Sequence, residues 1–111
     1  MKPAKAARPR PDLVAAERGG DPSRTMDGEA DPDHAPLEMA LYWRQIYTEV
    51  LAMEELVLKR IRDLMAKQSD IARHEVELTN VPVVVAQADR FRQRLGYWTV
   101  RVEELEQALV K

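Results

Sequence analysis

The stretch that decides the fold runs from Pro82 to Leu109 and reads PVVVAQADRFRQRLGYWTVRVEELEQAL. Along it, apolar residues recur at alternating steps of four and three, an arrangement that returns them to one face of an α-helix in every heptad. The positions of this seam are Val84, Ala88, Phe91, Leu95, Trp98, Val102, Leu105 and Leu109. The stretch therefore predicts an amphipathic helix over residues 82–109.

A longer helix is expected before it, over about residues 37–79. No Pro or Gly occurs between Leu37 and Pro82, and strong helix formers dominate this region. An apolar residue recurs every seven positions, at Trp43, Val50, Val57, Leu64, Ile71 and Leu78. Ile46 and Met53 occupy the second seam position, which then passes to Arg60 and Lys67. This change indicates a stutter in the coiled-coil repeat.

The two helices are separated by Thr79-Asn80-Val81-Pro82, where two capping residues precede a proline suited to a first helical turn. The sequence therefore predicts an all-α fold, a long antiparallel coiled-coil hairpin with a turn at about 79–82. One kinked helix is the alternative. In the hairpin the expected neighbours are Ile71 with Phe91, Leu64 with Trp98, and Val57 with Leu105.

This hairpin would be unequal, because the first helix would be about 64 Å long and the second about 43 Å. The unpaired start of the first helix is rich in large apolar residues, which occupy most of its circumference. Such a surface needs a cover, and a second chain, the folded-back N-terminal segment or another protein could supply it. We expect a homodimeric bundle and a protein partner, with the interface formed by Leu37, Leu41, Tyr42, Trp43, Ile46, Tyr47 and Val50.

Residues 1–35 form a charged segment that contains five prolines, three glycines and no aromatic residue. A segment of this composition buries too little apolar surface to offset its ordering entropy, so we expect a disordered tail. Within it, residues 11–18 precede Gly19-Gly20 and could form two helical turns. A helix that short needs a surface to fold on.

In the predicted register, basic residues of both helices meet at mid-length. This belt is a candidate contact for phosphate or an acidic partner, and its residues are Arg60, Lys67, Arg92, Arg94 and Arg101. A solvated charged face with local ion pairs is the alternative interpretation.

Signatures of catalysis are scarce. The chain has no cysteine, no Gly-rich phosphate loop and no nucleophile elbow. Its two histidines, His34 and His74, are far apart in the sequence, so a metal site is not expected. We therefore expect neither an enzyme nor a cofactor.

The net charge of -2 argues against a general nucleic-acid coat, and no apolar run reaches the roughly 18 residues of a membrane span. We expect a cytoplasmic protein with no membrane contact. The leading functional hypothesis is a non-enzymatic helical adaptor that self-associates and binds a protein partner through the start of its first helix. The alternative is a regulatory binder of nucleic acid, a phosphate-bearing ligand or the transcription machinery, acting through the basic belt and the tail.

Overall fold

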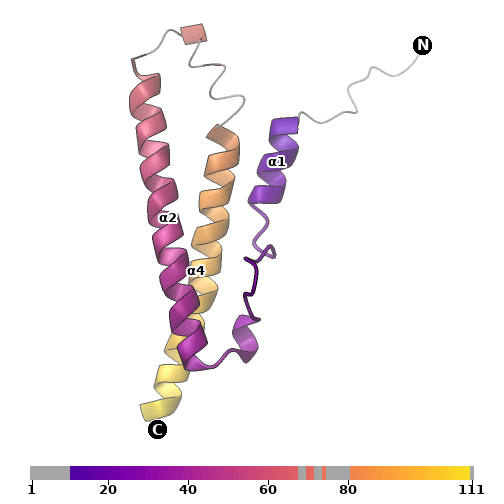
Figure 1. The fold of residues 1–111 in the computed structure, drawn as a ribbon, viewed down its shortest axis with the longest axis vertical. Helices are drawn as coiled ribbons and strands as arrows, with labels where there is room; N and C mark the ends of the chain where they lie inside the picture. The colour runs from indigo at the N-terminus through magenta and orange to yellow at the C-terminus, as the bar shows by residue number, and fades with distance from the viewer. Residues whose placement is uncertain (1–10, 68–69, 72–73, 75–80, 111) are drawn as a thin grey trace, which may run out of the picture.

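The computed structural model describes residues 11–67, 70–71, 74 and 81–110, and these form helices and connecting turns. The helices whose bounds lie within the described residues are α1 (Pro11–Gly19), α2 (Leu37–Met65) and α4 (Val81–Val110), with a short 3-10 helix η2 at Pro32–His34, and residues 70, 71 and 74 are also helical. In Figure 1, α4 lies between the other two, and α2 and α4 run in opposite directions. The predicted all-α class is confirmed.

Helix α4 follows the seam that the sequence predicts. Ala88, Trp98 and Val102 are buried, and Phe91, Leu95 and Leu105 pack partly buried around them. Leu109 departs from the pattern, because it lies in the last turn and is exposed. The uninterrupted four-three spacing thus identifies the inner face of this helix up to its final turn.

Helix α2 is shorter than predicted. It ends at Met65, where backbone hydrogen bonds from Ala66 to Arg62 (3.1 Å) and from Lys67 to Leu64 (3.1 Å) close the last turn. The predicted helix to residue 79 is therefore wrong at residues 66–67, whereas residues 70, 71 and 74 are helical. Residues 75–80, which include half of the predicted turn at 79–82, lie outside the described residues, and Val81 and Pro82 belong to α4. With 29 residues in α2 and 30 in α4, the two helices have nearly equal lengths, and the predicted overhang does not exist.

The register between α2 and α4 also differs from the prediction. Trp98 stacks on Trp43, with ring centroids 6.5 Å apart, and Phe91 lies 6.1 Å from Tyr47. Leu64, the expected neighbour of Trp98, is instead 50% exposed. The observed register pairs aromatic side chains with one another, whereas in the predicted register Trp98 and Phe91 would each face an aliphatic residue. Aromatic pairs contribute stability beyond the area that they bury.

In α2, the apolar residues that recur every seven positions turn away from the interface with α4 between Trp43 and Leu64. The buried positions Ala40, Trp43, Tyr47 and Leu58 follow the 3.6-residue period of a straight helix. A strict seven-residue repeat drifts by about 20° per heptad relative to that period. As a result, Trp43 is buried, whereas Val57 and Leu64 lie on the outside.

The N-terminal segment is folded from residue 11 onward, so the predicted disorder of residues 1–35 is wrong for residues 11–35. Helix α1 packs on α4, as expected for a short helix that needs a surface. The approach is close at the glycines, since a Cβ on Gly20 would come within 3.3 Å of Ala86 Cβ. Residues 1–10 lie outside the described residues.

Candidate functional site

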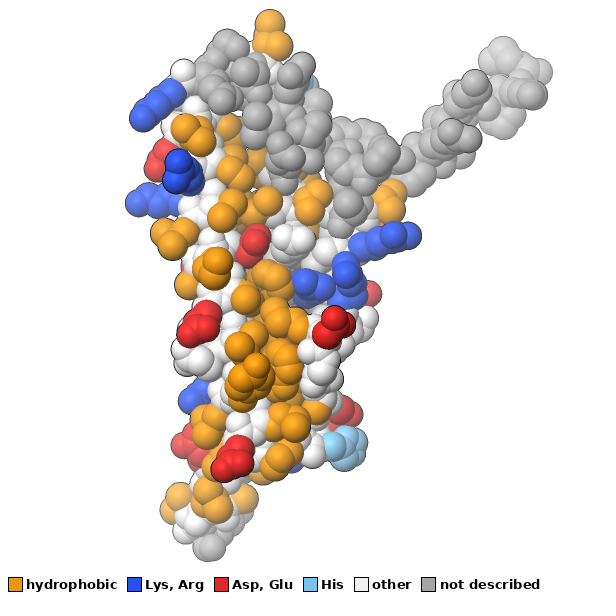
Figure 2. Space-filling view, in the orientation of Figure 1, with side chains coloured by type: hydrophobic (Ala, Val, Ile, Leu, Met, Phe, Trp, Pro, Cys, Tyr) orange, Lys and Arg blue, Asp and Glu red, His pale blue; other side chains and the backbone are white. Residues whose placement is uncertain are grey.

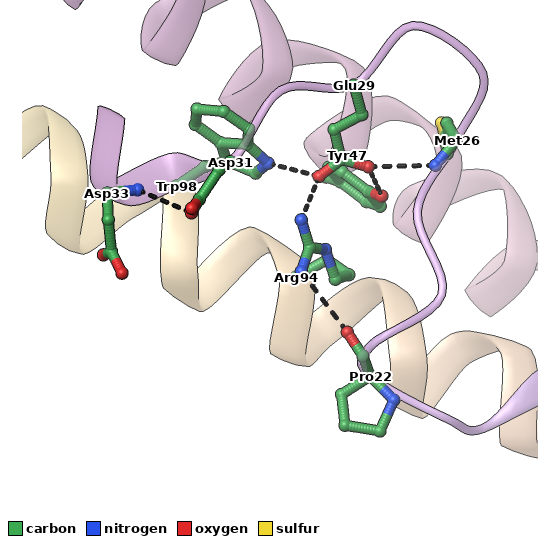
Figure 3. Close-up of polar contacts among 8 residues, drawn as sticks. All are labelled: Pro22, Met26, Glu29, Asp31, Asp33, Tyr47, Arg94 and Trp98. Carbon is green, nitrogen blue, oxygen red and sulfur yellow. Dashed lines mark hydrogen bonds and ion pairs between the residues drawn. The ribbon is translucent and has the colours of Figure 1, made fainter. Parts of the chain in front are cut away.

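Residues 20–35, which we call the strap, connect α1 to α2 and carry one glutamate into the interior. The Glu29 side chain is fully buried, and Figure 3 shows its carboxylate surrounded by polar groups from α2 and α4. Oε1 accepts a hydrogen bond from the Tyr47 hydroxyl, and Oε2 accepts one from Arg94 Nη2 and one of 2.7 Å from Trp98 Nε1. We call Glu29, Tyr47, Arg94 and Trp98 the buried quartet.

Local backbone geometry holds Glu29 in this position. Its Oε1 also accepts a hydrogen bond of 3.0 Å from the Met26 backbone N–H, while the Glu29 N–H donates back to the Met26 carbonyl oxygen at 3.0 Å. Between them, Gly28 has a φ of 82°, a conformation that residues with a Cβ rarely adopt. The tight turn thereby directs the glutamate inward, although most side chains around it are exposed.

Arg94 is the basic member of the quartet and is buried on α4. Besides Glu29 it contacts the strap a second time, because Nη1 donates to the Pro22 carbonyl oxygen at 3.3 Å. Its guanidinium also lies 5.3 Å from the centroid of the Tyr97 ring. Nε, however, is buried and has no hydrogen-bond partner among the described residues. The arginine therefore holds the strap while one of its donors stays unused.

The environment keeps both members of this ion pair charged. Burial by itself raises the pKa of Glu29, but the hydrogen bonds from Tyr47, Arg94, Met26 and Trp98 outweigh it and lower the pKa below its ordinary value. Burial also disfavours the charged form of Arg94, which by itself would lower the pKa of this residue. The hydrogen bond to Glu29 and the charge of Glu29 outweigh burial, so the pKa of Arg94 is raised above its ordinary value. The quartet thus contains an ion pair, Glu29 with Arg94, inside a cluster of aromatic side chains.

Tyr47 makes the stability of the protein sensitive to alkaline pH. Burial and its hydrogen bond to the Glu29 carboxylate raise the pKa of Tyr47 from 10 to about 12. The folded state therefore holds this proton more tightly than the unfolded state. This contribution to stability is complete below pH 10 and is lost as the pH rises towards 12. Urea denaturation at a series of pH values should show this loss.

The matched variants for this experiment are Tyr47→Phe, which removes the titrating group, and Tyr42→Phe, which changes an exposed tyrosine of the same helix. The alkaline loss should be smaller in Tyr47→Phe and unchanged in Tyr42→Phe. Equal slopes in all three proteins between pH 10 and 12 would contradict the assignment.

The predicted interface residues of α2 divide into two groups. Trp43 and Tyr47 are buried within the chain, and Leu37, Ile46 and Val50 pack partly buried against the same core. Only Leu41 and Tyr42 are exposed. Helix α4 and the strap thus cover most of a surface for which the sequence predicted a second chain, and the folded-back segment, one of the three options, supplies part of that cover.

The predicted basic belt is dispersed by the observed register. Arg94 is buried against Glu29, and Arg101 Nε donates to the Ala35 carbonyl oxygen at 3.0 Å. Arg92 is exposed and pairs with Asp89 at 2.7 Å and with Glu55 at 3.3 Å. Arg60 and Lys67 are exposed near the opposite end of α2 from the contact of Arg101. The five side chains therefore do not form one surface.

A different surface is left open on α2, and we call it the outer stripe. It consists of apolar residues at heptad spacing, several of which belong to the seam predicted from the sequence: Met39, Ile46, Val50, Met53, Val57 and Leu64. Met53 is 66% exposed and Val57 44%, whereas Ile46 and Val50 are partly covered by the core. In the space-filling view of Figure 2, apolar side chains run along much of the molecule. Exposed apolar residues at this spacing are typical of a helix that packs on another helix.

The role of Glu29 was not predicted from the sequence, and Arg94 was predicted at the surface but is buried. Glu29 lies in a polar, glycine-containing segment whose composition favours disorder, and Arg94 has the same local pattern as its exposed neighbour Arg92. The available signal was Gly28 directly before an acidic residue, which indicates a turn but not the direction of the side chain. Only the packing of the strap on α2 and α4 brings these residues together.

Two further features bear on function. Among the described residues, no three or more His, Cys, Asp or Glu side chains lie close enough to share a metal ion. None of the helices in the described part of the chain has the length and apolar character needed to cross a bilayer.

The chain matches no protein-family model, no curated protein and no solved structure.

Proposed function

We propose that this protein is a non-enzymatic helical interaction protein that self-associates through the outer stripe of α2. The observation that carries the proposal is the exposure of Met53, Val57 and Leu64 at heptad spacing on a helix whose other face packs on α4. Burying such a stripe against a second helix removes apolar surface from water, which is the main driving force for helix association. In this proposal, two copies of the chain associate as a dimeric coiled coil.

The charges beside the stripe favour a second copy in the antiparallel direction. If Met53 packs beside Val57 of the second chain, Ile46 lies beside Leu64 at each end. The same alignment brings Glu49 to the level of Arg60 in the other chain, and both residues are exposed. Two symmetric pairs of opposite charge would then flank the apolar contacts. In the parallel direction each charge would face its own like charge.

The alternative function, a binder of nucleic acid or phosphate through the basic belt, has less support. It requires Arg94 and Arg101 at the surface, and both make internal contacts to the strap. The interaction protein is therefore the better-supported function, and a further protein partner would contact the outer stripe of α2 or the dimer formed through it.

The test is a charge placed at the centre of the stripe. Val57→Asp should weaken the dimer at least about a hundredfold, because each dimer would bury two unpaired carboxylates at the contact. Ala52→Asp is the matched control, since it adds the same charge to an exposed position on another side of α2. Sedimentation equilibrium of both variants and the wild type measures the dissociation constants. A wild-type protein that stays monomeric at about 100 µM, a concentration at which weak specific dimers form, contradicts the proposal.

Charge exchange tests the direction of pairing. Glu49→Arg alone and Arg60→Glu alone should each weaken association, because each places like charges side by side. The double variant should restore much of it, and the salt dependence of all four proteins should follow the same order. Two single variants that associate like the wild type would exclude the antiparallel alignment.

A further inference from the structure

The buried quartet differs from an ordinary ion pair in how its parts are supplied. Three donors come from two long, packed helices: the Tyr47 hydroxyl from α2, and Arg94 and Trp98 from α4. The carboxylate alone comes from the strap. The donors therefore form a preorganised receptor, and Glu29 fills it as a ligand that is part of the same chain (Figure 3).

The strap itself is anchored at few positions: Ala35 is buried in the core, Met26 packs against the core, and Glu29 enters the quartet. Most of its side chains are exposed, and most of its backbone hydrogen bonds are internal, such as Arg24 to Asp21 and His34 to Asp31. Among the described residues, its polar contacts to α2 and α4 are the Glu29 bonds, the Pro22 carbonyl bond and the Ala35 carbonyl bond. Its contacts to α1 are hydrogen bonds that Gly20, Asp21 and Arg24 donate to backbone carbonyl oxygens of that helix. A segment with few buried contacts is among the first parts of a protein to open locally.

The receptor also retains binding capacity that Glu29 does not use. A guanidinium binds a carboxylate most strongly when two of its nitrogens donate in parallel. Glu29 receives a bond from Nη2, while Nε of the buried Arg94 has no partner among the described residues. A carboxylate on a segment free of the constraints of the Gly28 turn could engage both nitrogens.

We infer that Tyr47, Arg94 and Trp98 form a binding site for a glutamate-bearing acidic segment of a partner protein, and that Glu29 of the strap occupies this site until the partner displaces it. We infer the acidic character of the partner segment from the strap that it would replace, in which Glu29 is surrounded in the sequence by Asp27, Asp31 and Asp33. Displacement would free the strap and uncover the aromatic cluster to the incoming segment. The inference does not rest on the exposed residues of the outer stripe, because Met53, Val57 and Leu64 are not members of the buried quartet.

The test uses the full chain and a synthetic peptide with the sequence of residues 20–35 as the probe. In the wild type, the tethered strap competes at a high effective concentration, so the peptide should bind weakly. Two variants weaken the tethered strap. Glu29→Gln removes its charge, and Gly28→Ala strains its turn without adding a contact, because no atom lies within 4 Å of the added Cβ.

Both variants should bind the peptide at least about tenfold more tightly than the wild type does. A peptide in which Gln replaces Glu at the position of Glu29 should bind at least about tenfold more weakly than the natural peptide, because it lacks the charge that Arg94 pairs with. Fluorescence anisotropy of a labelled peptide gives the affinities. Tryptophan emission reports occupancy, since both tryptophans of the chain, Trp43 and Trp98, stack in this cluster.

Circular dichroism separates loss of binding from loss of folding. If Glu29→Gln does not fold, Gly28→Ala, which keeps all four members of the quartet, carries the test. A folded Gly28→Ala protein that binds neither peptide, or binds both equally, overturns the inference. Because Val57→Asp leaves the receptor intact, peptide binding should be unchanged in that background, which distinguishes this site from the proposed dimer surface.

Discussion

Replacing Glu29 with Ala should lower the free energy of unfolding by about 3–5 kcal/mol, the range found when one partner of a buried ion pair is removed. The loss arises because Arg94 stays buried and charged without its carboxylate, while Tyr47 and Trp98 lose the acceptor of their hydrogen bonds. For a domain whose total stability is about 5–15 kcal/mol, this is a large fraction. Urea denaturation monitored by tryptophan fluorescence, at one fixed protein concentration, measures it.

Two controls show whether the charge pair is the cause. Asp27→Ala changes an exposed acidic residue of the same strap and should leave the denaturation midpoint unchanged. The double variant Glu29→Ala with Arg94→Met removes both charges, so it should be more stable than Glu29→Ala alone. A double variant that is less stable than the single variant would mean that the packing of Arg94, and not its unpaired charge, dominates.

Replacing Trp98 with Ala should cost about 3–5 kcal/mol, as is typical when a buried aromatic residue is truncated. Trp98 is fully buried, stacks on Trp43 and donates its indole N–H to Glu29. The substitution therefore opens a cavity between α2, α4 and the strap and removes one bond of the quartet. Thermal or urea unfolding of the variant at fixed concentration measures the loss.

Leu109→Ala is the informative comparison for this variant. Leu109 occupies the same predicted seam on α4 as Trp98, but it is 73% exposed in the last turn of the helix. Truncating it should have little effect on stability. Similar losses in the two variants would show that the seam is buried to its end, in conflict with the observed packing.

The sequence by itself determined the helical class and the identity of α4. The unbroken four-three spacing from Val84 to Leu105 specifies one apolar face, because helix geometry alone decides which residues share a side. It also indicated the short helix before Gly19-Gly20, and the need of that helix for a surface to pack on. These features depend on residues close together in the chain, so local periodicity and local backbone preferences are sufficient.

Tertiary structure decided the rest: where α2 ends, which residues of α4 it meets, and that the strap folds back. Several registers of two apolar faces look alike in sequence, and the choice depends on the joint packing of Trp43, Tyr47, Phe91 and Trp98. The buried pair of Glu29 and Arg94 joins residues 65 positions apart. No local pattern reveals such a pair, because a charged side chain is buried only where distant donors happen to converge on it.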